Sequence, residues 1–161
     1  MKKLFIPLIL FAFILCGCSS EKTADPIVSG IAFDADIEFN SKSYSCAVKL
    51  ENSGNTEVKV TKPSNLAGLK ISGKNGKFTA EYLGIKKELN ESALDSAADI
   101  ILKCYDSVFE AEKKEDNNCS ASGKIGDIDY IYTYSPLGLP ISLSVPDKNL
   151  NAEFYNVKTI K

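Results

Sequence analysis

The sequence contains no histidine, tryptophan or arginine and only one methionine. Without histidine, the chain cannot form a Ser-His-Asp or Cys-His catalytic group, or a zinc site that uses histidine. Without arginine, it lacks the planar side chain that binds carboxylates and phosphates through two parallel hydrogen bonds. These absences predict a protein that is not an enzyme. The less favoured alternative is a histidine-free hydrolase that works with two carboxylates.

The basic side chains are all lysines, and 19 of them stand against 21 acidic residues, which gives a net charge of −2. Nucleic-acid binding needs a concentrated basic surface, so no nucleic-acid partner is expected. The sequence also lacks a P-loop and a dinucleotide fingerprint, so no nucleotide cofactor is expected. A lysine-only set of basic residues with abundant Asn, Ile and Tyr is typical of a low-GC genome and indicates a Gram-positive bacterium.

The cysteines do not form an even set. Outside the first eighteen residues, only Cys46, Cys104 and Cys119 remain, and their spacing matches no metal motif. Cys46 alternates with apolar residues and Cys104 lies on an apolar helical face, so both are interpreted as small buried side chains. Cys119 is expected in a polar loop. A Cys104–Cys119 disulfide is the less favoured alternative.

The N-terminus has the layout of a secretory signal. Lys2 and Lys3 precede an apolar run from Leu4 to Leu15, and small residues follow it. A membrane-spanning helix needs about 20 apolar residues, so this run is too short to be one. Residues 1–17 are therefore predicted to be a signal peptide.

The segment Leu15-Cys16-Gly17-Cys18 resembles the bacterial lipobox. That resemblance implies cleavage after Gly17 and a covalent diacylglycerol on Cys18, with no other cofactor. Two acyl chains hold a protein stably on a membrane, whereas one does not. The expected location is the extracytoplasmic face of the cell membrane, with residues 18–29 as a lipidated leash.

Residues 30–161 are predicted to form one domain. Period-2 alternation predicts about eight strands joined mostly by short turns. Between the fifth and sixth of them, residues 92–111 follow the i, i+3, i+4, i+7 pattern of an amphipathic helix. The stretch 110–118 is interpreted as a charged loop. The predicted fold class is α+β, with a curved antiparallel sheet, an open half-barrel, wrapped over this one long helix.

Three short segments resemble the LolA/LolB/RseB-type fold. They are residues 60–69, with a strand followed by proline, residues 82–85, and residues 137–141, with a Gly-Leu-Pro entry into a late strand. Together they resemble a group of small Clostridia-type lipoproteins. The sequence departs from this family because a leash replaces the first helix and arginine is missing. The resemblance implies a concave apolar face that holds an acyl chain, a peptide or a segment of a partner.

The apolar side chains expected to point into such a groove come from several strands and the helix. They are Phe33, Ile37, Phe39, Val48, Leu50, Phe78, Tyr82, Tyr105 and Phe109. The predicted function is therefore a membrane-anchored, non-enzymatic lipoprotein that binds a hydrophobic ligand or a protein partner in the cell envelope. The alternative is an assembly partner of a cell-wall or sporulation enzyme.

Two other patterns favour structural interpretations. Asp34, Asp36 and Glu38 alternate along one strand, and Asp127 with Asp129 repeats the pattern. Alternating acids are typical of a solvated strand face, so no metal site is expected. A stripe of tyrosines at 130, 132 and 134 is interpreted as sheet packing, with a ligand platform as the alternative.

Overall fold

In this computed structural model, the described residues are 25–74, 77–89, 97–107, 109–115 and 117–160. They form one antiparallel sheet of eleven strands, and β1 pairs with both β2 and β11 at its centre. The order across the sheet is β6-β5-β4-β3-β2-β1-β11-β10-β9-β8-β7. The strands are β1 (Ile31–Phe39), β2 (Lys42–Leu50), β3 (Asn55–Lys62), β4 (Lys70–Lys74), β5 (Lys77–Tyr82), β6 (Ile85–Leu89), β7 (Phe109–Glu115), β8 (Asn118–Ile125), β9 (Ile128–Tyr134), β10 (Pro140–Val145) and β11 (Leu150–Thr159). The helix α2 (Ala97–Asp106) precedes β7, and the short 3₁₀ helix η1 (Pro146–Lys148) precedes β11.

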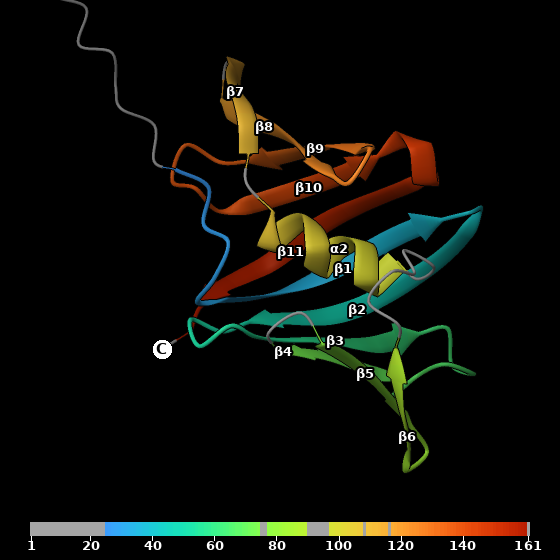
Figure 1. The fold of residues 1–161 in the computed structure, drawn as a ribbon. Coiled ribbons are helices and arrows are strands. Elements are labelled where there is room, and N and C mark those ends of the chain that lie inside the picture. The colour runs from blue at the N-terminus through green and yellow to red at the C-terminus, as the bar shows by residue number, and fades with distance from the viewer. Residues whose placement is uncertain (1–24, 75–76, 90–96, 108, 116, 161) are drawn as a thin grey trace, which may run out of the picture.

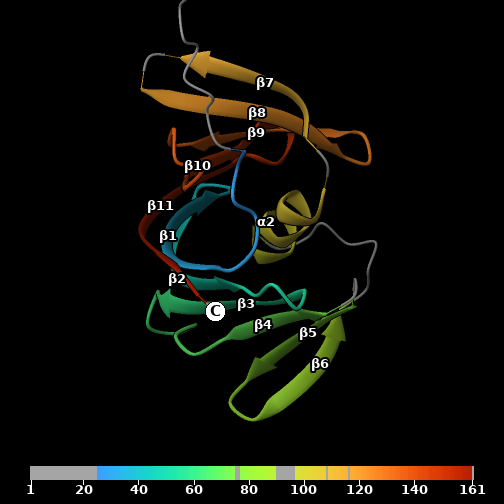
Figure 2. The ribbon, with the colours of Figure 1, turned by 90° about the vertical axis from the view of Figure 1, so that its left-hand side faces the viewer.

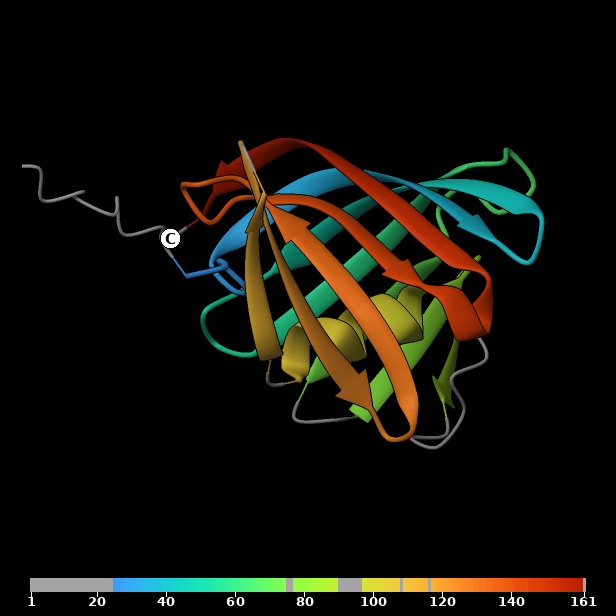
Figure 3. The same cartoon turned by 90° about the horizontal axis from the view of Figure 1, so that it is seen from above.

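The sheet is curved, and α2 lies on its inner face. Figures 1 and 2 show the strands bending around the helix, and Figure 3 shows the same curvature from above. In β1, the side chains of Ile31, Phe33, Ala35 and Ile37 are buried, and the residues between them are more exposed. Successive side chains of a strand point to opposite faces, so this alternation gives the sheet one apolar and one polar face.

The predicted combination of about eight strands with one long helix is wrong. Residues 92–96 of the predicted helix lie outside the described residues, and the helix ends at Asp106 rather than at residue 111. Both the backbone N–H and the hydroxyl of Ser107 bond to the carbonyl of Cys104, which closes the last turn. The chain then continues as strand β7, so the molecule is nearly all sheet.

The sequence pattern did not predict strands β6, β7 and β8. The charged loop expected at residues 110–118 is wrong. Strand β7 covers most of that stretch, and β8 begins at its end. Strands β6 and β7 form the two edges of the sheet, and charged residues are frequent on such edges. Strand β8 buries Cys119, Ala121 and Gly123, which are small side chains that give little hydrophobic signal.

The strands have two distinct ends, which matter for the position of the N-terminus. At one end, a row of register pairs runs from Thr159 through Ile31, Leu50 and Thr56 to Gly73. The segment before β1 and the turn between β9 and β10 lie at this end, on the left in Figure 1. The β5–β6 turn lies at the opposite strand ends, because β5 leaves this row toward Tyr82.

Candidate functional site

The inner face brings together most of the predicted groove residues. All of them except Tyr82 belong to one buried cluster, in which Phe39 and Phe109 are partly buried. The half-buried Tyr82 instead donates its hydroxyl to the carbonyl of Asn65 at 2.6 Å, at the far end of β5. The predicted set therefore marks the core of the protein, and Tyr82 lies outside it.

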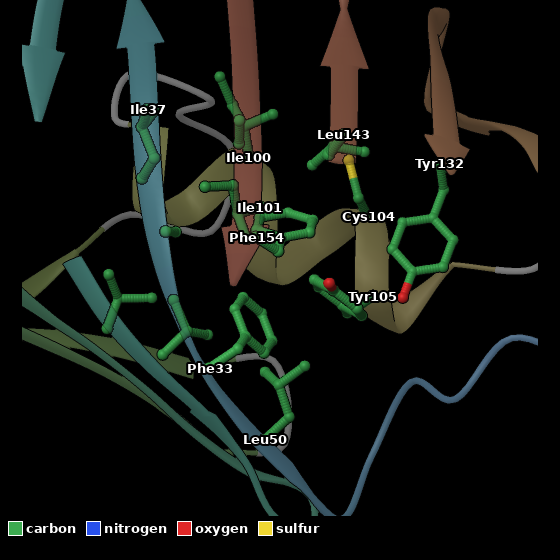
Figure 4. Close-up of a cluster of buried hydrophobic side chains, with 14 of the residues drawn as sticks. Phe33, Ile37, Leu50, Ile100, Ile101, Cys104, Tyr105, Tyr132, Leu143 and Phe154 are labelled. Carbon is green, nitrogen blue, oxygen red and sulfur yellow. The ribbon is translucent and has the colours of Figure 1, made fainter. Parts of the chain in front are cut away.

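An aromatic row crosses the inner face beneath α2. Phe33 contacts Phe154 with a ring-centroid separation of 4.8 Å, and Tyr105 contacts the edge of Tyr132 at 5.4 Å. Phe109 stacks on Tyr132 at 5.6 Å. These separations are within the range in which aromatic pairs attract. The row therefore links the two sides of the curved sheet through the helix, as Figure 4 shows for Phe33, Phe154, Tyr105 and Tyr132.

The Tyr105 hydroxyl is buried and has no hydrogen-bond partner among the described residues. The side chain is 8% exposed. Burial, with a smaller effect of the neighbouring Tyr132, raises the pKa of Tyr105 well above its ordinary value of 10. A buried donor without a partner costs about 1–3 kcal/mol, so its presence calls for an explanation.

The neighbouring tyrosines have partners. The Tyr130 hydroxyl is hydrogen-bonded to that of Ser107, and the Tyr132 hydroxyl donates to the carbonyl of Ile27 at 3.4 Å. Tyr130, Tyr132 and Tyr134 are each at most 2% exposed, so the tyrosine stripe lies in the core. Tyr105 differs from these residues because its hydroxyl comes from the helix rather than from a strand.

Several inner-face residues were not singled out from the sequence. Phe154, Ile100 and Leu143 are buried beside the predicted set (Figure 4). Phe154 follows Leu150 and Ala152 in strict alternation, which is a signal that could have identified it. Ile100 precedes Ile101 in the helix, and both are fully buried. Only the tertiary contacts decide that two adjacent helical positions are covered, since these point about 100° apart.

The three described cysteines are free and buried, so the alternative of a Cys104–Cys119 disulfide is not realised. Burial raises the pKa of the Cys46 thiol to about 11 and that of Cys104 to about 12. Only the thiolate is an effective nucleophile, so these two thiols are chemically inert near neutral pH. Cys119 was expected in a polar loop, which is wrong because it lies buried on β8.

The alternating acids lie on the outer face. Asp36 accepts hydrogen bonds from Ser45 at 2.7 Å and from Tyr155 at 3.4 Å, and Asn156 donates to Asp34. A hollow of about 730 Å³ on this polar face includes Asp36 and Glu38 in its lining. In the part of the chain that the structure describes, no group of three or more His, Cys, Asp or Glu side chains is placed to hold a metal ion.

Cys18 lies outside the described residues, so its lipidation stays a prediction. Within the described ranges, no helix has the length and apolar character needed to cross a membrane. The end of the predicted leash contacts the domain, because Ile27 and Val28 pack against the core. The backbone N–H of Ile27 also donates to the carbonyl of Gly138 at 2.8 Å.

No protein-family model and no curated protein matches this chain. Its fold is similar to an uncharacterized conserved protein from Thermus thermophilus, at 9% identity and a TM-score of 0.49, over 83% of this chain and 82% of that chain. It is also similar to a LolA superfamily protein from Nitrosomonas europaea, at 11% identity and a TM-score of 0.47, over 81% of this chain and 85% of that chain. A third similar structure is a DUF1329 family protein from Desulfovibrio piger, at 9% identity and a TM-score of 0.36, over 81% of this chain and 86% of that chain. TM-scores below 0.5 at such identities transfer no function to this chain.

Proposed function

We propose that this chain is a lipid-anchored, non-enzymatic protein of the bacterial cell envelope that binds a hydrophobic ligand on the inner face of its sheet. The observation that carries the proposal is the Tyr105 hydroxyl, which is buried and has no hydrogen-bond partner of good geometry among the described residues, with the hydroxyl of Tyr132 as a polar neighbour. An acyl ligand presents the complementary features, since it combines a long apolar chain with a carbonyl or carboxyl oxygen. The oxygen would accept a hydrogen bond from Tyr105 while the chain packs against the aromatic row.

The surroundings of Tyr105 support such a ligand. Phe33, Phe154 and Tyr132 lie around its ring, so aromatic side chains surround the position from which the hydroxyl projects. The short α2 that carries Tyr105 has only ten described residues, and the eleven-stranded sheet offers a much longer inner face. Ligand sites are mostly apolar with a few placed polar groups, which is the composition found here.

The absence of histidine, together with the inert thiols of Cys46 and Cys104, supports a binding role over catalysis. The anchoring part of the proposal rests on the motif that ends at Cys18. It is tested by metabolic labelling with a fatty acid. We expect the label to be lost in Cys18→Ala and kept in Cys16→Ala, and label that survives Cys18→Ala would contradict the assignment.

The ligand part is tested by titrating the delipidated domain with a fluorescent fatty acid. Tyr105→Phe removes only the hydroxyl, so we expect the free protein to gain about 1 kcal/mol of stability. The same variant should bind the probe about fivefold more weakly, since one neutral hydrogen bond is worth about 1 kcal/mol.

Tyr82→Phe is the matched control, because Tyr82 lies outside the core cluster. It should leave the affinity for the probe unchanged. Saturable binding that does not respond to Tyr105→Phe would place the ligand elsewhere. No saturable binding in a well-folded sample would contradict the ligand proposal.

A second candidate function is the docking of an envelope protein, such as a cell-wall or sporulation enzyme. The observation that favours it is the β5–β6 turn, where Leu83 is 83% exposed and Ile85 is 74% exposed. Leu83 also has a φ of 51°, a left-handed conformation that is unfavourable for leucine. Co-purification of one recurrent protein from membranes, lost in Leu83→Asn but kept in Tyr105→Phe, would favour this function.

A further inference from the structure

The turn between β9 and β10 holds an exposed leucine next to the N-terminal segment. The backbone N–H of Gly138 donates to the carbonyl of Ser135 at 2.8 Å, and the N–H of Leu139 donates to the Ser135 hydroxyl at 3.2 Å. These bonds define the turn and leave Leu137 outside it, 72% exposed. Pro136 beside it is also exposed. The turn therefore presents an apolar tip to its surroundings.

This turn is attached to the segment that leads to the predicted anchor. Ile27 donates its N–H to the carbonyl of Gly138, and a Cβ atom at position 138 would collide with the carbonyl oxygen of Asp25. Gly138 has a φ of 81°, which favours glycine for a second reason. The N-terminal segment and the turn therefore occupy a fixed position relative to each other.

The chain length between Cys18 and this attachment is short. Six residues lie between Cys18 and Asp25, which makes seven steps along the chain, and an extended chain spans at most about 3.6 Å per step, so the reach is at most about 25 Å. A nine-residue strand such as β1 is itself about 30 Å long. An anchor at Cys18 therefore keeps the strand ends beside the N-terminal segment, called the near end, close to the lipid. It disfavours contact by the opposite ends, where the β5–β6 turn lies.

A pair of lysines at the near end suits an anionic lipid headgroup, although the exposed acid Asp25 lies at the same end. Lys74 and Lys77 are exposed and directly opposite each other in the register of β4 and β5. Like charges across two strands repel, and a nearby anion relieves that repulsion. The acidic Glu51 at the same end is paired with Lys49 at 2.5 Å. Lysines near a membrane are attracted to anionic headgroups.

We propose that the strand ends that carry the N-terminal segment face the membrane, and that Leu137 contacts the lipid. This inference rests on the proposed anchor at Cys18 and is independent of any ligand on the inner face. The lipid surface is the occupant because the chain between Cys18 and Asp25 is too short to hold Leu137 far from it. The β5–β6 turn, at the opposite strand ends, then lies away from the lipid.

The test uses the full-length lipidated protein, purified from membranes and reconstituted into phosphatidylcholine–phosphatidylglycerol vesicles. Leu137→Cys is labelled with a fluorophore that lipid-borne bromine quenches. Leu83→Cys is the matched control, since Leu83 is 83% exposed, against 72% for Leu137, and lies in the turn at the opposite strand ends. Labelling is selective because Cys46, Cys104 and Cys119 are buried.

In vesicles that contain brominated lipid, the label at position 137 should lose most of its emission, and the label at position 83 should keep it. Protein that floats with the vesicles but shows equal quenching at both positions, or quenching only at position 83, overturns the orientation alone. Protein that does not float with the vesicles overturns the anchor and the orientation with it. Loss of flotation in Cys18→Ser distinguishes covalent anchoring from adsorption.

Discussion

The two arms of the sheet bury the same inner face with different side chains. The early arm, β2–β6, uses mainly aliphatic residues such as Val48, Val58 and Ile71. The late arm, β7–β10, pairs tyrosines of β9 with small residues of β8. Their register pairs are Tyr134 with Cys119, Tyr132 with Ala121, and Tyr130 with Gly123. Branched side chains fill the face by themselves, whereas large rings need neighbouring positions to be left empty.

Helix α2 lies between the two arms, so a buried charge on it should have the largest effect. Ile101 is fully buried, and Ile101→Asp places an unpaired carboxylate in the core. We expect a loss of about 4 kcal/mol or more, with both arms melting together. The matched control Ile85→Asp changes an exposed residue and should stay within about 0.5 kcal/mol of the parent. Urea unfolding followed by far- and near-ultraviolet circular dichroism measures both. If the late arm keeps its tyrosine signal in Ile101→Asp, the arms do not depend on the helix.

The next largest effect is expected from a methyl group added under an aromatic ring, and its cost in stability should differ between the two arms. Gly123 lies beneath Tyr130, and Gly73 lies beside Phe78, so a Cβ at either position collides with the ring. Tyr130 is 1% exposed and bonded to Ser107, whereas Phe78 is 9% exposed and lies one strand from the sheet edge.

Gly123→Ala should therefore cost about 2–3 kcal/mol, because the ring cannot move, and Gly73→Ala about 1 kcal/mol. Urea unfolding of both variants measures the two free-energy costs and shows which is larger. Equal costs would show that both rings are held with similar rigidity, and the comparison of the arms would fail.

The contribution of a single buried tyrosine to the loss of stability at alkaline pH should be the smallest of these effects. Burial raises the pKa values of Tyr105 and Tyr132, and it raises that of Cys104 to about 12. Groups whose pKa is higher in the folded state stabilise the fold below their unfolded pKa, about 8.5 for Cys and 10 for Tyr. This stability is lost as the pH rises above those values.

We expect the free energy of unfolding to fall between about pH 7 and about pH 10.5, because each unit of separation is worth about 1.4 kcal/mol. Tyr132→Phe should reduce this loss, and the control Tyr82→Phe, altered in a residue outside the core cluster, should not. The difference between the two pH values in urea unfolding measures the effect. An unchanged alkaline loss in Tyr132→Phe would remove this residue from the explanation.

Aliphatic strands were predictable and small-residue strands were not. In β1 and β2, large apolar residues alternate with polar ones, so the period of two is visible in the sequence. In β8, the buried positions hold Cys119, Ala121 and Gly123, whose burial makes sense only beside the rings of β9. The edge strand β6 has no fully buried position, and only its last residue, Leu89, packs against the core, so no alternation could identify it.

The candidate site shows a similar division. Phe33, Leu50 and Tyr105 were predicted to lie on the inner face, since their positions follow a strand or helix period. That the Tyr105 hydroxyl has no partner among the described residues depends on which groups surround it in three dimensions. Tyr82 follows the same alternation as Phe78, yet its hydroxyl is bonded to the loop carbonyl of Asn65 at the far end of the strand.

The sequence by itself determined the antiparallel meander of alternating strands and predicted the motif at Cys18, because strand periodicity and short motifs are local properties of the chain. The tertiary structure alone decided where α2 ends, the existence of β6 to β8, and the burial of the Tyr105 hydroxyl without a partner among the described residues. It also decided that Gly138 holds the N-terminal segment beside Leu137. These features depend on which distant residues share space, and packing between segments far apart in the chain is set by the complete fold rather than by any local pattern.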